Sequence, residues 1–185
     1  MFGFLSRLLG REAAPGELDV LAGRLIDYTQ GLSAGAILLP QIDGVVADPK
    51  AAKAEDLVGK GYFDWTIEAQ VFLVSFLVEV CIDRDVTDAG AVFGVVECVF
   101  REALKRPEAE AQGMTISALK LRQLAIDGEG GEELEDDIRK LIPVAALGIQ
   151  RGKAFAARID GGDHSPTLEE LEDFVARFGG QGGSG

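Results

Sequence analysis

The residues of this chain best suited to chemistry are Ser33, within the motif "GLSAG", and the single histidine, His164. The motif matches the G-x-S-x-G nucleophile elbow, in which a strained turn between a strand and a helix exposes the serine hydroxyl beside backbone N–H donors. A histidine downstream of the serine also follows the order found in esterases. This pattern gives one alternative hypothesis, a small hydrolase that uses Ser33 and His164.

The sequence around the motif does not suit an elbow. Apolar residues recur at helical spacing from Leu18 to Leu32, where an elbow would need a strand. Pro40 follows soon after, so we expect "GLSAG" to be the Gly-rich end of a helix. His164 falls in "GGDHSP", which predicts a solvated turn before the last helix. We therefore do not expect an enzyme that uses Ser33 and His164.

Three carboxylates form a second candidate site, because Glu68 and Glu79 share a face of an apolar segment and Glu97 comes from the next segment. Buried together, they could hold a metal or exchange protons, and a carboxylate metal-binding helical protein is a further alternative. The Glu-x-x-His motif of di-iron bundles is absent from the sequence, as are a P-loop and an EF-hand. We therefore expect a solvent-facing polar stripe, with no metal and no cofactor. Its predicted members are Asp64, Glu68, Ser75, Glu79 and Asp83.

The charge of the chain argues against nucleic acid as a partner. Its 185 residues include 31 acids and 18 bases, which gives a formal net charge of -13. Such an excess repels phosphate backbones, whose binding depends on basic side chains that release counterions. The two cysteines, Cys81 and Cys98, show neither zinc-site spacing nor a disulfide framework. A reducing cytoplasm suits these cysteines best, so we expect a cytoplasmic protein.

The most apolar segment is "VFLVSFLVEVCI", Val71 to Ile82. Its uncharged part is only eight residues long, from 71 to 78, whereas a membrane-spanning helix needs about 20. We therefore predict a buried helix from Asp64 to Arg84, followed by a second apolar helix from Asp85 to Arg106. A short acidic turn joins them, so we expect an antiparallel pair at the centre of the fold. The predicted core residues of this pair are Phe72, Phe76, Val92, Val96 and Phe100.

These patterns together predict an all-α fold, a single domain of roughly six to eight helices over residues 15–178. Residues 35–49 are compatible with a hairpin, a short helix or an ordered loop. Pro143 should kink or divide the helical pattern around it. Thr167 and Glu170 have the spacing of a capping box at the start of the last helix. Residues 179–185 form a Gly-rich tail that we expect to be flexible.

Two segments are candidate interaction surfaces. The first is an amphipathic N-terminal segment, residues 1–14, which is typical of an interfacial or docking helix. The second is the acidic stretch "EGGEELEDD", which suits a basic partner. The predicted partner-binding residues are Phe2, Phe4, Leu5 and Leu8 in the first surface, and Glu132, Glu133, Asp136 and Asp137 in the second.

The sequence therefore favours a non-catalytic, protein-binding or regulatory helical protein. An adaptor is one form of this role, and an immunity-like neutraliser of a basic partner fits the acidity of the chain. Weak contact with the inner face of a membrane through the N-terminus fits the amphipathic segment. The sequence does not decide between these forms.

Overall fold

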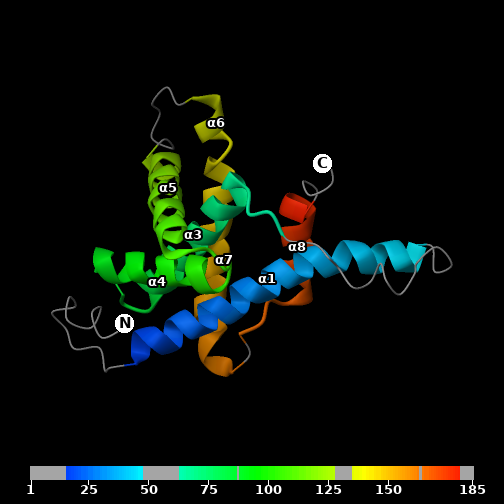
Figure 1. Ribbon diagram of the computed structural model, residues 1–185, viewed down its shortest axis with the longest axis horizontal. Coiled ribbons are helices and arrows are strands. Elements are labelled where there is room, and N and C mark those ends of the chain that lie inside the picture. Colours follow the sequence, from blue (N-terminus) through cyan, green and yellow to red (C-terminus); the bar gives the residue numbers. More distant parts are fainter. Residues whose placement is uncertain (1–15, 48–62, 87, 128–134, 163, 180–185) are drawn as a thin grey trace.

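The computed structural model describes residues 16–47, 63–86, 88–127, 135–162 and 164–179, and every regular element in these ranges is helical. The predicted all-α fold is therefore confirmed, and the helices form one compact domain (Figure 1). The elements are α1 (Glu17–Ala47), α3 (Ile67–Asp83), α4 (Ala89–Glu102), α5 (Glu108–Asp127), α6 (Asp136–Arg139), α7 (Ile142–Arg158), a 3-10 turn (Ile159–Gly161) and α8 (Leu168–Phe178).

Helix α3 is the centre of the core. The Thr66 side chain caps its first turn by accepting a hydrogen bond from the Ala69 backbone N–H. Every side chain from Val71 to Cys81 is buried, so α3 is enclosed on all sides by other helices. The apolar segment thus serves the core of the domain. Within the described residues, none of the helices combines the length and the apolar character that crossing a bilayer requires.

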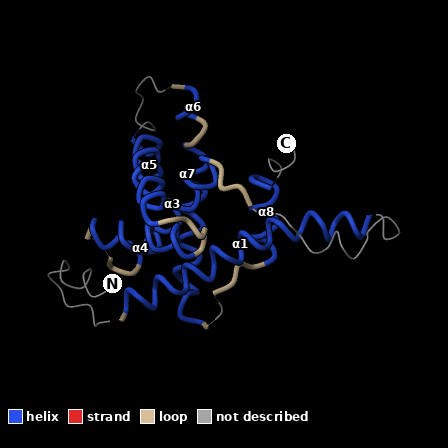
Figure 2. Tube along the Cα trace, viewed as in Figure 1, coloured by secondary structure: helices blue, strands red, loops and turns tan. Residues whose placement is uncertain are grey.

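The main partner of α3 is α7, whereas we expected α4 in that role. Helix α4 runs across the upright helices α5 and α7, while α1 crosses the domain diagonally and reaches α8 (Figures 1 and 2). Two glycines of α7 explain the close approach to α3. A Cβ atom on Gly152 would lie 2.7 Å from the Phe76 carbonyl oxygen, and one on Gly148 would meet the Phe72 carbonyl oxygen. Only glycine lets the two backbones come this close.

Helix α1 is longer than the sequence suggested. It continues through the "GLSAG" motif and through Pro40 to Ala47, so the helix end expected at the motif is wrong and the start of the unassigned segment 35–49 is helical. The glycines of the motif face the C-terminal part of the chain. A Cβ atom on Gly31 would lie 2.5 Å from the Pro166 side chain, and one on Gly35 would meet Leu171. The motif is therefore a contact surface for α8 and for the segment that leads into it.

The ends of the other helices follow local chemistry. Asp88 caps α4 by accepting a hydrogen bond of 2.8 Å from the Ala91 backbone N–H. The preceding Asp85 has a positive φ of 58° and belongs to the turn. Pro143 divides the predicted helix into α6 and α7, and the capping box at Thr167 is present, both as expected. Of the five predicted core residues, Val92 is half-buried and the other four are buried.

Candidate functional site: an ion-pair network between α7 and α8

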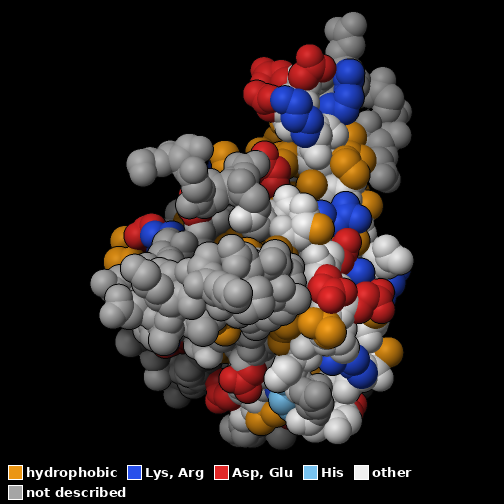
Figure 3. Space-filling model, turned by 90° about the vertical axis from the view of Figure 1, so that its right-hand side faces the viewer, with side chains coloured by type: hydrophobic (Ala, Val, Ile, Leu, Met, Phe, Trp, Pro, Cys, Tyr) orange, Lys and Arg blue, Asp and Glu red, His pale blue; other side chains and the backbone are white. Residues whose placement is uncertain are grey.

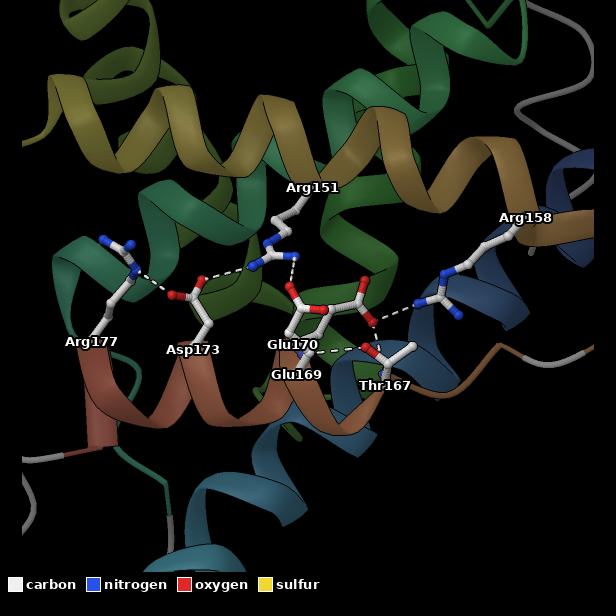
Figure 4. A network of polar contacts seen from close by, with 7 residues as sticks. All are labelled: Arg151, Arg158, Thr167, Glu169, Glu170, Asp173 and Arg177. Atoms are coloured by element: carbon white, nitrogen blue, oxygen red, sulfur yellow. Dashed lines mark hydrogen bonds and ion pairs between the residues drawn. The ribbon is translucent and has the colours of Figure 1, made fainter.

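Arginines of α7 face carboxylates of α8 across a narrow gap (Figure 4). Arg158 Nη2 donates to Glu170 Oε2 at 2.6 Å, and its Nη1 donates to the Ser165 carbonyl oxygen at 3.2 Å. The same Glu170 oxygen accepts the Thr167 backbone N–H at 2.7 Å, which completes the capping box. One carboxylate therefore stabilises the first turn of α8 and attaches that turn to α7.

Arg151 makes the second connection between the two helices. It lies seven residues before Arg158, so two helical turns place both side chains on the same face of α7. Its Nη2 atom is 3.2 Å from Asp173 Oδ2, and its Nη1 atom is 3.8 Å from Glu169 Oε1. Asp173 also accepts a hydrogen bond of 3.0 Å from Arg177 Nε on its own helix. The network thus runs along most of α8.

The polar network flanks an aromatic contact. Phe174 and Phe178, one turn apart on α8, are both buried and both reach Phe72 of α3, with ring centroids 5.7 and 5.5 Å apart. Phe63 and Trp65 surround Phe174, with centroids at 5.3 and 5.7 Å. Buried aromatic pairs of this kind stabilise a contact beyond the area that they bury. The phenylalanines therefore anchor α8, and the ion pairs fix its orientation.

A small cavity lies between α8 and the helices beneath it. Its volume is about 10 Å³, which is close to the space that one water molecule occupies. Burial raises the pKa of the Tyr28 phenol far above its ordinary value, and the negative charge of Glu170 acts in the same direction. A hydrogen bond between the phenol and Glu170 contributes to the same shift, so the Tyr28 hydroxyl joins α1 to the carboxylate that caps α8. The cavity is lined by Tyr28, Leu32, Phe72, Leu147, Arg151, Glu170, Asp173, Phe174 and Phe178.

The ion pairs set the protonation of Asp173. Burial is the largest single influence on this carboxyl and favours its neutral form, but hydrogen bonds from Arg177 and Arg151 together outweigh it. The pKa of Asp173 therefore lies below its usual range. Each arginine drawn in Figure 4 faces at least one carboxylate, so the arrangement can hold a helix by charge pairing.

The structure places Ser33 in the interior of α1, so the strand and turn of a nucleophile elbow are not formed around it. Its hydroxyl donates to the Thr29 carbonyl oxygen one turn earlier, at 3.1 Å. His164 lies in a loop before α8, as predicted, and is half-buried. Its Nδ1 atom is buried and has no hydrogen-bond partner in the described part of the chain. Solvation of this side chain is therefore less complete than we expected.

Two of the three candidate carboxylates, Glu79 and Glu97, form ion pairs with different bases. Glu79 is buried and pairs with Lys153 at 3.5 Å, while Glu97 pairs with Arg101 at 4.0 Å. The expectation of a solvent-facing stripe is wrong for Glu79 and Ser75, because Gly152 and Gly148 of α7 pack against them. Within the ranges that the structure describes, no three metal-binding side chains lie close enough together to hold an ion.

The predicted partner-binding residues are only partly described. Asp136 and Asp137 lie on α6 with 88% and 92% of their side chains exposed, as a docking patch requires. They pair with Arg139 at 3.5 Å and with Lys140 at 2.9 Å, so basic neighbours offset their charge. Acidic and basic side chains gather together at the end of the molecule where α6 lies (Figure 3). Outside the described residues lie Phe2, Phe4, Leu5, Leu8, Glu132 and Glu133.

Sequence reasoning missed most of the α7–α8 network. The capping box singled out Glu170, but nothing assigned it a partner on another helix. The spacing of Arg151 and Arg158 was the available signal, since basic residues seven apart share a helix face. Asp173 lies three residues after Glu170, so the two carboxylates share a face of α8 and could meet two arginines that share a face of α7.

Comparisons with known proteins add no identification. No protein-family model matches the chain, and neither the curated proteins nor the solved structures give a significant match. The function proposed below therefore rests on the charges and contacts of the chain itself.

Proposed function

We propose that this chain is a non-catalytic helical protein that binds a protein partner, as an adaptor or as an immunity-like neutraliser of a basic protein. The observation that carries the proposal is an acidic face where α1 packs against α4. We define this acidic face by Asp19 in the first turn of α1 and by Glu97 and Glu102 on α4, since the two helices pack against each other. Arg101 is the base beside them, 2.9 Å from Glu102 and 4.0 Å from Glu97.

The acidic face suits a basic partner for an electrostatic reason. Three carboxylates with one guanidinium leave a local negative charge, and the chain as a whole carries -13. Such a field attracts a positively charged protein over about a Debye length and speeds its association. The acidic face is thus a second candidate surface for a basic partner. The first is the acidic stretch that includes Asp136 and Asp137, where basic neighbours offset part of the charge.

The non-catalytic part of the proposal is supported by the state of the nucleophilic side chains. Ser33 donates its hydroxyl to a helix carbonyl. Burial raises the pKa of Cys81 to about 12 and also raises that of Cys98, so neither thiol ionises readily at neutral pH. Labelling with a fluorophosphonate tests this part, and we expect no modification of Ser33. Stoichiometric modification at Ser33 would overturn it.

A cytoplasmic location is part of the same proposal. Cys81 and Cys98 are both buried and both free, which suits a compartment that keeps thiols reduced. Transient contact with the inner membrane surface through residues 1–11 is compatible with this location. Co-sedimentation with anionic vesicles measures that contact, and it should be lost from a variant that lacks residues 1–11.

A pull-down from the native host tests the binding role. The native chain is compared with D19N/E97Q/E102Q, with a variant in which Glu132, Glu133, Asp136 and Asp137 are changed to Ser, and with the variant lacking residues 1–11. The matched control is D64N, at an exposed position outside both surfaces. We expect a partner that D64N retains and that at least one acidic-surface variant loses. Equal retention by every variant would contradict both acidic surfaces.

A further inference from the structure

The acidic face, where α1 packs against α4, has an apolar edge. Phe93 of α4 is half-buried and lies outside the packed core, and within the described residues its ring makes no aromatic contact. Glu97 follows Phe93 by four residues, so the ring and the carboxylate share a face of α4. On α1, Val20 is 54% exposed and comes directly after Asp19. The surface therefore suits a ligand that is both apolar and basic, since aromatic rings and carboxylates both attract guanidinium groups.

The charges of the acidic face are not balanced by the described part of the chain. Arg101 lies 2.9 Å from Glu102 and 4.0 Å from Glu97, so two carboxylates share one guanidinium group. Asp19 forms no ion pair with any base in the described ranges. Three acids against one base leave two negative charges in excess. A basic segment with apolar side chains would offset this charge and cover the exposed ring.

The segment that precedes α1 has the matching charge and composition. Residues 1–11 contain Arg7 and Arg11 and no acid, although the chain as a whole has 31 acids and 18 bases. Its two positive charges equal the two negative charges in excess on the acidic face. The segment is also rich in large apolar side chains, whose contact with water is unfavourable. These side chains are Phe2, Phe4, Leu5, Leu8 and Leu9.

The segment is attached beside the acidic face. Asp19 lies in the first turn of α1, and the start of α1 lies near α4 in Figure 1. Five residues separate Arg11 from Glu17, and this tether spans about 20 Å when extended. So short a tether gives an effective concentration in the millimolar range. The acids of α6 are a poorer match, because α6 lies on the far side of the domain and its acids already pair with bases (Figure 1).

We propose that residues 1–11 of this chain bind its own acidic face in the free protein. Arg7 and Arg11 lie against the carboxylates, and the apolar side chains lie against Phe93 and Val20. The segment then occupies the surface that a basic partner would use, so the partner must displace it. This regulation of the acidic face rests on the proposed function, whereas the contact within the chain does not.

Cross-linking in the full chain tests the contact directly. R7K/R11K keeps both positive charges and introduces amines into residues 1–14, which contain no lysine. A carbodiimide joins these amines to carboxylates that they touch, and mass spectrometry identifies the joined positions. We expect links to Glu97 or Glu102 on α4 and none to the more exposed acids of α6. A folded chain without links to α4 would overturn the proposal.

Competition by a free peptide tests whether the native segment occupies the face. The probe is a fluorescent peptide of residues 1–14, and fluorescence anisotropy measures its affinity. We expect it to bind the full chain carrying R7E/R11E at least about tenfold more tightly than the native chain or the R7K/R11K control, because the reversed charges free the acidic face. Adding E97Q/E102Q to the R7E/R11E chain should weaken that binding by about tenfold. Equal affinity for all these chains would contradict the proposal.

Two other occupants of the segment give different results. Links between an isotope-labelled and an unlabelled R7K/R11K chain would make a second copy the occupant and would overturn the proposal. Vesicles of phosphatidylserine and phosphatidylcholine test the membrane instead. If the acidic face holds the segment, E97Q/E102Q should release it and increase co-sedimentation severalfold over the native chain. Equal co-sedimentation of the two chains would show that the acidic face does not hold the segment.

The affinity of a captured basic partner separates this proposal from the proposed function. The partner should bind R7E/R11E severalfold more tightly than R7K/R11K, because it no longer displaces the segment. Cross-links to α4 without any partner on the acidic face would leave the contact standing and contradict the proposed function. A partner that binds the acidic face of a chain without those cross-links would support the proposed function and overturn this inference.

Discussion

Arg158 Nη2 lies 2.6 Å from Glu170 Oε2, and this carboxylate oxygen also accepts the backbone N–H of Thr167 at 2.7 Å. The same oxygen therefore closes the N-terminal cap of α8 and pairs with a base of α7. A change at Glu170 should affect both the helix and its attachment. The neighbouring Glu169 is 85% exposed and lies 3.8 Å from Arg151, which makes it a matched control on the same helix.

The first prediction compares these two glutamates. Glu170→Ala removes a cap and a charged hydrogen bond, and it should lower the free energy of unfolding by about 2 to 4 kcal/mol. Glu170→Gln should cost less, because glutamine can complete a capping box. Glu169→Ala should stay within about 0.5 kcal/mol of the native chain. Urea unfolding measures all three, and equal losses at the two positions would refute the dual role of Glu170.

The second prediction concerns the glycines between α7 and α3. Gly148→Ala and Gly152→Ala each place a methyl group against backbone atoms of α3, and each should destabilise the domain by about 1 to 3 kcal/mol. Gly113 on α5 has no atom within 4 Å of a Cβ position, so Gly113→Ala should instead stabilise by about 0.5 to 1 kcal/mol. Thermal unfolding followed by circular dichroism gives the sign of each change. Stabilisation by Gly152→Ala would show that α3 and α7 are farther apart than described.

The third prediction is that both cysteines resist alkylation in the folded chain. Burial raises the pKa of Cys81 to about 12, and burial is also the largest cause of the raised pKa of Cys98. At pH 8 iodoacetamide should therefore leave both thiols unmodified, whereas in denaturant both should react. Mass spectrometry counts the adducts. Rapid modification of Cys98 in the folded chain would place its thiol at the surface beside the acidic face.

The fourth prediction concerns acid. The folded pKa of Asp173 is lowered, so its ionised form adds stability above the unfolded pKa of about 3.9. That contribution is lost as the pH falls through the folded pKa. The free energy of unfolding should therefore decrease between about pH 5 and pH 3, and it should decrease less in D173N. An identical pH dependence in D173N and the native chain would mean that the Asp173 ion pairs do not stabilise the fold.

The class of fold and the burial of the interior of α3 could both be predicted from the sequence. Helical periodicity and length identified the buried helix. Four of the five core positions predicted in α3 and α4 are buried, including Phe76 and Phe100. The local signals at Pro143 and Thr167 were also sufficient, because a missing N–H and a capping box act within a few residues. These features depend on short stretches of chain, which a single sequence contains in full.

The arrangement of the helices was not predictable in the same way. The glycines at 31 and 35 were interpreted as a helix end, but they accommodate Pro166 and Leu171, which are more than a hundred residues away in the sequence. Likewise, Glu79 was placed in a solvated stripe because its partner helix, α7, was unknown. Burial by distant segments overrides local patterns, and periodicity alone does not show which helix packs against a given face.

The most direct measurement of the binding role is the affinity of the captured partner for the native chain at rising salt concentration. Between about 50 and about 300 mM salt the affinity should fall severalfold, because exposed charge attraction is screened over about a Debye length. The variant D19N/E97Q/E102Q should bind more weakly at low salt and respond less to added salt. An affinity that is independent of salt, and equal in the native chain and this variant, would contradict a basic partner on the acidic face.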